Sequence, residues 1–130
     1  MYSKDIDFTV YNPLDHTYIK NIEVKECKNI SHYGTMFIEL SDDVFLNRKG
    51  WIYTTEADEV WYCDYYNDIA YVFHPQEMRN YLKNNSSEFF VRTHKGRGKD
   101  SDGAIVSPVK YAENYHIRTE KLKPLELAHE

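Results

Sequence analysis

The chain has 130 residues, of which 42% are hydrophobic and 28% are charged, and this balance excludes an intrinsically disordered tail. Its net charge of −5 argues against a dedicated nucleic-acid binder, because such proteins are usually basic, so any nucleic-acid contact is expected to be local and metal-assisted. No apolar run approaches the roughly 20 residues of a membrane span and MYSKDIDF carries no apolar signal region, so we expect one cytoplasmic domain over residues 1–130 without membrane contact.

Alternating polar and apolar residues predict a β-hairpin in the first part of the chain. Residues 5–11 (DIDFTVY) alternate as a strand does, residues 12–16 (NPLDH) have turn chemistry, and residues 17–27 resume the strand pattern. We therefore expect the two strands to pair in antiparallel fashion. The NISH segment at 29–32 breaks the second strand, and a third strand is expected over residues 33–40.

The middle of the chain predicts a short helix, two strands and a longer helix. A helical turn or short helix is expected around residues 50–57, and strands over 59–64 and 69–73 are joined by a tight polar turn at 66–68. Pro75 suits the first position of a helix, and the QEMRNYLKN segment that follows places its apolar residues at helical spacing.

The last part of the chain predicts short extended segments around a loop. Residues 88–94 are expected to form a strand, residues 95–103 a mobile loop, and residues 104–112 and 115–120 strand or extended pieces, before a tail at 121–130 that frays or forms one helical turn. Together the elements predict a mixed α+β domain with a central mixed β-sheet flanked by one or two helices.

Three charged residues of the predicted hairpin are candidates for a catalytic site. If the strands pair, Asp7 lies near the face that carries Glu23 and Lys25. Two converging carboxylates repel each other unless a cation lies between them, and Mg²⁺ prefers such oxygen ligands. The ion can polarise a phosphodiester and activate water, and a nearby lysine can orient that water. The alternatives are a solvated strand face and, for Asp5 with Asp7, the charged guard of an edge strand.

The order Asp7, then Glu23-Val24-Lys25 on the next strand, resembles the PD-(D/E)XK nuclease superfamily. The resemblance implies a restriction-endonuclease-like core in which Asp7 and Glu23 bind Mg²⁺, with Mn²⁺ as a substitute, and Lys25 assists the attacking water. Asp5 competes with Asp7 for the first position. The family places a helix before this Asp, whereas only MYSK precedes Asp5, so the leading helix is lost, supplied by the C-terminal half or borrowed from a partner subunit.

The likeness extends over about residues 5–84. The segments YGTMFIEL, KGWIYTTEADEVWYCD and IAYVFHPQEMRNYL are similar to segments of small phage and bacterial members of this superfamily. On that match Glu39 is an accessory ligand or a substrate contact, and a plain surface residue is the competing interpretation.

One clear basic stretch, RTHKGRGK at residues 92–99, stands out in an acidic chain. We expect it to hold nucleic-acid phosphates, with a solvated flexible loop as the alternative. The six His residues lack the spacing of zinc ligands, and Cys27 and Cys63 lack CxxC spacing, so two reduced thiols are expected. The four cations assigned to nucleic-acid binding are Arg92, Lys95, Arg97 and Lys99.

Two functions are therefore expected from the sequence, together with a weaker third. The first is a Mg²⁺-dependent nuclease that hydrolyses the phosphodiester bonds of DNA or RNA. The second is a catalytically inactive binding protein on the same fold, such as a phage-encoded inhibitor of a host nuclease or defence complex. The acidic net charge, the missing leading helix and the aromatic strands support this second function. The third is an assembly protein that forms a homodimer through its aromatic strands.

Overall fold

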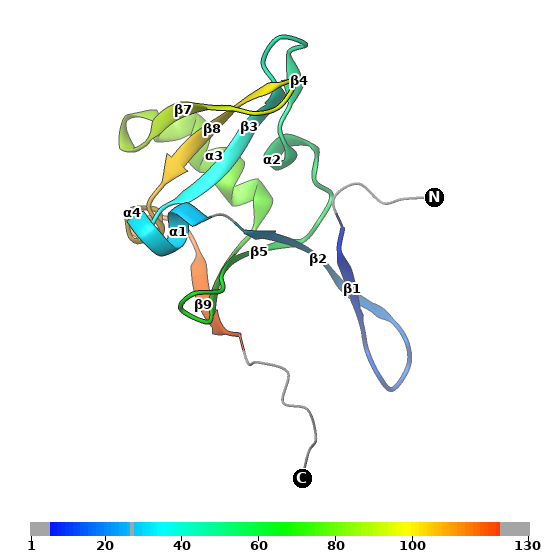
Figure 1. The fold of residues 1–130 in the computed structure, drawn as a ribbon. Helices are drawn as coiled ribbons and strands as arrows, with labels where there is room; N and C mark the ends of the chain where they lie inside the picture. The colour runs from blue at the N-terminus through cyan, green and yellow to red at the C-terminus, as the bar shows by residue number, and fades with distance from the viewer. Residues whose placement is uncertain (1–5, 27, 123–130) are drawn as a thin grey trace.

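The computed structural model describes residues 6–26 and 28–122, and it confirms an α+β fold with a mixed central sheet (Figure 1). The central sheet has five strands in the order β1-β2-β5-β6-β9. Neighbouring strands are antiparallel except for β2 and β5, which run parallel. The five strands are β1 (Phe8–Tyr11), β2 (Tyr18–Glu26), β5 (Glu59–Asp64), β6 (Ile69–Phe73) and β9 (Ile117–Lys121).

A second, four-stranded antiparallel sheet, which we did not expect from the sequence, has the strand order β4-β3-β8-β7. Its strands are β3 (Met36–Asp43), β4 (Arg48–Lys49), β7 (Phe90–Lys95) and β8 (Asp100–Val106). Between the strands lie α1 (Lys28–Tyr33), α2 (Trp51–Thr54), α3 (Pro75–Asn84), the 3₁₀ turn η1 (Ser86–Glu88) and α4 (Pro108–Tyr111).

One hydrophobic cluster joins both sheets to α3. It includes Ile38 of β3, Val60 and Tyr62 of β5, and Met78 of α3, each of which is almost fully buried. The Tyr62 hydroxyl also accepts a hydrogen bond from the Phe37 backbone N–H at 2.9 Å, which links the central sheet to the second sheet. The face of the central sheet that carries Val60 and Tyr62 is therefore its inner face.

Several predicted elements are confirmed. Strands β5 and β6 have the bounds expected from the sequence, the β1–β2 hairpin pairs in antiparallel fashion, and a short helix, α2, lies within residues 50–57. Helix α3 begins at Pro75 and buries Met78, Tyr81 and Leu82, as its spacing predicts.

The NISH segment follows the end of the second strand, as expected, and lies in α1, where Ile30 is buried against the core. Two local predictions are wrong. Residues 100–103 belong to β8 rather than to a loop, because they pair with the exposed edge strand β7. Residues 108–111 form a helix, α4, which Ser107 caps by accepting a hydrogen bond from the Lys110 backbone N–H, with Pro108 at its first position.

Candidate functional site

Strand β2 presents two different sets of side chains. In its parallel register with β5, Glu23 lies beside Val60 and Lys25 beside Tyr62, so both charged residues occupy the inner face of the central sheet. Ile22 and Val24 occupy the outer face, which faces away from the core. The expectation that Glu23 and Lys25 share one face follows from strand alternation and is met.

Glu23 and Lys25 are in direct contact. The Lys25 ammonium lies 3.3 Å from Glu23 Oε2, and Glu23 is only 1% exposed. The same ammonium lies 5.1 Å from the centre of the Trp51 ring, which adds a cation–π contact. A buried carboxylate needs such a partner because an isolated charge in the interior is costly.

Glu39, the accessory candidate, lies in the same neighbourhood. Its Oε1 accepts a hydrogen bond from the Trp51 backbone N–H at 3.3 Å. Burial raises the pKa of Glu39, the negative charge of Asp42 adds to this rise, and the nearby Lys25 ammonium opposes it. The structure thus brings Glu39 close to the Glu23–Lys25 pair.

Asp7, which directly precedes β1, contacts the backbone of β2. Its Oδ2 accepts a hydrogen bond from the Val24 backbone N–H at 2.7 Å. Asp7 also lines a shallow groove with a volume of about 650 Å³, together with Phe8, Val24 and Trp61. Asp5, the competing candidate, lies outside the described residues.

The four predicted phosphate-binding cations lie on the β7–β8 hairpin of the second sheet, and all are exposed. Lys99 forms an ion pair with Asp42, which leaves Arg92, Lys95 and Arg97 as the larger part of the basic surface. Arg92 shares a register row and a face with Glu39, with Gly103 between them. Their backbones are therefore two strand spacings apart, about 10 Å.

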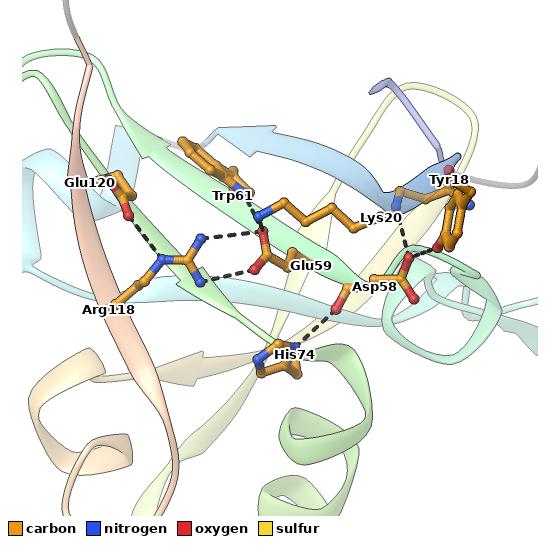
Figure 2. A network of polar contacts seen from close by, with 9 residues as sticks. Tyr18, Lys20, Asp58, Glu59, Trp61, His74, Arg118 and Glu120 are labelled. Atoms are coloured by element: carbon orange, nitrogen blue, oxygen red, sulfur yellow. Dashed lines mark hydrogen bonds and ion pairs between the residues drawn. The ribbon is translucent and has the colours of Figure 1, made fainter. Parts of the chain in front are cut away.

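A charged network on the outer face of the central sheet was not expected from the sequence (Figure 2). Glu59 is 6% exposed and accepts from Arg118 at 2.9 and 3.3 Å and from Trp61 Nε1 at 3.1 Å, and the Lys20 ammonium lies 3.0 Å away. Burial opposes ionisation, but these donors outweigh it and lower the pKa of Glu59 to about 2. Lys20, Glu59 and Arg118 come from three strands, so no local pattern signals the network.

The base of the β1–β2 hairpin is tied to β5 by Asp58. Its carboxylate accepts hydrogen bonds from the Tyr18 hydroxyl and from the Asn21 backbone N–H, the latter at 2.8 Å. The Asp58 backbone N–H donates in turn to the Asn21 carbonyl at 2.9 Å, and the His74 ring contacts the Asp58 carbonyl (Figure 2). Asp58 therefore connects the hairpin to the residues that lead into β5.

Strand β1 differs from the other edge strands of the described sheets. Its sequence, FTVY, contains no charged residue, and Phe8 and Tyr11 are 60% and 56% exposed. The edge strands β4, β7 and β9 each carry at least two charged or ionisable residues. Charged residues on an edge strand prevent pairing with other chains, so β1 is the unguarded edge.

The backbone of Thr9 points to the open side of β1. Thr9 lies opposite Asn21, whose N–H and C=O both bond to Asp58 on the far side of β2. Directly opposed residues of an antiparallel pair either exchange both hydrogen bonds or exchange neither. The N–H and C=O of Thr9 therefore point away from β2, toward solvent at the edge of the sheet.

Among residues 6–26 and 28–122, no three His, Cys, Asp or Glu side chains are grouped so that they could hold one metal ion. In the same part of the chain, no helix has the length and apolar character needed to span a membrane. Cys63 is a buried thiol, and burial raises its pKa, whereas Cys27 lies outside the described residues.

No family model, curated protein or solved structure matches this chain.

Proposed function

We propose that this chain is a non-enzymatic binding protein that docks on another protein chain by strand addition at β1. The observation that carries the proposal is the contrast between β1, with its uncharged and exposed FTVY sequence, and the charged edges β4, β7 and β9. In strand addition, main-chain hydrogen bonds supply affinity and alternate side chains supply specificity. Thr9 provides the outward main-chain groups, and Phe8 and Tyr11 provide exposed aromatic surface.

The hairpin is ordered before a partner arrives. At its tip, Asn12 Oδ1 accepts from the Leu14 N–H at 2.8 Å, and Asp15 Oδ1 accepts from the Thr17 N–H at 3.0 Å. Asp58 holds its base. A binding element that is already ordered loses less conformational entropy on association. The exposed apolar side chains of the hairpin, which mark an interaction surface, are Phe8, Tyr11, Leu14, Tyr18 and Ile19.

The partner we propose is a host nuclease or defence complex, as for a phage-encoded inhibitor. The net charge of −5 supports a protein partner over a bare nucleic acid, because an acidic chain is repelled by phosphates. The buried Glu23–Lys25 contact supports a structural role for this pair, since Lys25 neutralises a carboxylate that lies inside the fold.

A capture experiment with edge variants tests this function. The wild type, Thr9→Lys and Thr93→Lys are immobilised separately and exposed to a cell extract. We expect a defined set of proteins to be retained by the wild type and by Thr93→Lys and lost with Thr9→Lys, because only Thr9 lies on the unguarded edge. Identical capture by all three proteins would overturn docking at β1.

The second candidate is the Mg²⁺-dependent nuclease, which the 3.3 Å contact between Glu23 and Lys25 favours, since these are the acid and lysine of the motif. The carboxylates of Asp7 and Glu23 are of the kind that Mg²⁺ or Mn²⁺ prefers, and the Asp7 carboxylate keeps lone pairs for an ion although its Oδ2 accepts from Val24. A bound ion would supply Lewis-acid polarisation of a phosphodiester. In this function Lys25 orients water, and the β7–β8 cations hold phosphates.

A cleavage assay separates the two candidates. The wild type and Lys25→Ala are incubated with single- and double-stranded DNA and RNA in the presence of Mg²⁺ or Mn²⁺. The binding proposal expects no cleavage by either protein. Metal-dependent cleavage by the wild type that is lost in Lys25→Ala would establish the nuclease in its place.

A further inference from the structure

We infer that in the free protein, before a host protein binds, β1 pairs with β1 of a second copy of this chain, antiparallel and related by a twofold axis at Thr9. This inference rests on the proposed function, since the second copy occupies the same edge that later receives the host protein. It follows from the direction of the Thr9 backbone groups, from the side chains that the axis places opposite each other, and from the distribution of charge over the sheet edges.

The backbone of β1 is self-complementary about Thr9. The Thr9 N–H and C=O both point to the open edge, because the opposed Asn21 uses its own groups on Asp58. On a twofold axis at this residue, each Thr9 N–H donates to the Thr9 carbonyl of the other copy. This closed, reciprocal pair is the arrangement of an antiparallel ladder and of an isologous dimer contact. It joins two five-stranded sheets into one continuous sheet.

The side chains of β1 also match under the same symmetry. With Thr9 on the axis, Phe8 of each copy lies opposite Val10 of the other, and the two threonines lie opposite each other. Pairs of an aromatic and a β-branched residue, and pairs of threonines, are favourable across antiparallel strands. Phe8, which is 60% exposed, gains an apolar neighbour in this way.

Electrostatics select β1 over the other edges for a contact between identical chains. Each copy carries a net charge of −5, so two copies repel at long range. Strand β1 itself carries no charge, and the axis places the adjacent Asp7 opposite the uncharged Tyr11 of the other copy, whereas self-pairing of β4, β7 or β9 would bring charged strands together. The remaining repulsion acts through solvent, where salt screens it, so added salt strengthens the dimer.

Sedimentation velocity of the full chain over a range of protein concentrations tests the inference. The wild type is expected to shift from 15.5 kDa to twice that mass as concentration rises. Thr9→Lys is expected to stay at 15.5 kDa, because two lysines would face each other on the axis. Thr93→Lys is the matched control and associates as the wild type does. Both threonines lie on exposed edge strands and donate to a side chain on the neighbouring strand, at 2.7 Å for Thr9 and 2.6 Å for Thr93.

A second variant tests the same contact in case the lysine of Thr9→Lys disturbs the hairpin. Thr9→Pro removes the outward N–H without removing a β1–β2 ladder bond, and proline is tolerated at such edge positions. It is also expected to remain monomeric. A wild type that stays monomeric at every concentration and salt level would overturn the dimer, as would dimers that persist in both Thr9 variants. A monomeric wild type whose protein capture is still lost in Thr9→Lys would retain the proposed function while removing the second copy as the occupant.

Discussion

Glu59 shows how a single buried acid can depend on charged donors that lie far away in the sequence. Arg118, Lys20 and Trp61 surround its carboxylate on the outer face of the central sheet. Burial favours the neutral form, yet the pKa of Glu59 falls to about 2 because the donors stabilise the charge more strongly. The ionised Glu59 carboxylate therefore stabilises the folded chain relative to the unfolded chain.

The lowered pKa of Glu59 predicts a specific loss of stability in acid. Because the folded pKa lies below the ordinary value of 4.5, this stability is present above pH 4.5 and is lost as pH falls through that value toward about 2. The loss is about 3 kcal/mol in the free energy of unfolding. Urea unfolding at a series of pH values measures it. Glu59→Gln should have a flatter profile over this range.

Glu120→Gln is the control for the acid experiment, because Glu120 also bonds Arg118 but its side chain is 42% exposed. Exposed ion pairs contribute little, so this variant should keep the acid dependence of the wild type. Equal acid profiles for the wild type and Glu59→Gln would contradict the account of the network.

The Glu23–Lys25 contact predicts a second effect at the residue scale. Lys25→Met should lower the free energy of unfolding by about 2 kcal/mol, because it removes a partner from a carboxylate that is 1% exposed. Adding Glu23→Gln to this variant should restore part of the loss, since a neutral amide is cheaper to bury. Denaturant unfolding of the single and double variants measures both steps. A double variant with a lower free energy of unfolding than Lys25→Met would contradict the pairing.

At this scale, strand alternation in the sequence was sufficient to place Glu23 and Lys25 on one face. It could not show that this face is the buried one, because both faces of β2 carry apolar and charged residues. Nor could it reveal the Glu59 network, whose members meet only after three strands have paired. Asp7 was expected beside Glu23 through its position in the hairpin, but its carboxylate turns to the backbone of Val24.

The joint between β4 and α2 depends on a glycine. A Cβ added at Gly50 would lie 2.2 Å from the Glu39 carbonyl oxygen, and backbone atoms cannot move aside as a side chain can. Gly50→Ala should therefore cost on the order of 3 kcal/mol of stability, measured by denaturant unfolding. Gly34→Ala is the comparison, because that site has open space and a φ of +67°. Backbone strain alone should cost it about 1 kcal/mol, and a larger loss for Gly34→Ala than for Gly50→Ala would contradict this account.

The β1–β2 hairpin predicts an effect on local opening. Asp58→Ala removes the acceptor of the Tyr18 hydroxyl and of the Asn21 N–H. We expect hydrogen exchange of the Asn21 amide to become about tenfold faster, while amides of α3 keep their rates. Asp15→Ala is the control at the hairpin tip, and it should affect the Thr17 amide instead. Unchanged exchange at Asn21 in Asp58→Ala would show that Asp58 does not hold the hairpin.

Elements with a strong local signal were predictable from the sequence, and those that depend on tertiary contacts were not. Strands β5 and β6 and helix α3 follow from alternation, a polar turn and Pro75. In contrast, the start of β8 looks like a loop because Asp100, Ser101 and Asp102 are polar residues that pair with the exposed edge strand β7. Helix α1 is only six residues long and lacks an acidic first turn, so nothing local marks it.

On the scale of the whole molecule, the arrangement of strands into two sheets determines which surfaces are open. The sequence predicts strands but not which of them lie at an edge, and the division into two sheets leaves β1, β9, β4 and β7 in that position. The uncharged FTVY segment indicates a binding edge only because it lies at an edge of the sheet, since an identical segment in a central strand would be ordinary. Binding at β1 is thus a property of topology combined with composition.

Hydrogen exchange of the Thr9 amide, compared between the free chain and its associated form, tests this claim most directly. The amide points to solvent in the free chain and should exchange rapidly there. Once a strand is added to β1, we expect its exchange to slow by at least tenfold, while the Thr93 amide on β7 keeps its rate. A Thr9 amide that exchanges equally fast in both forms would contradict docking at β1.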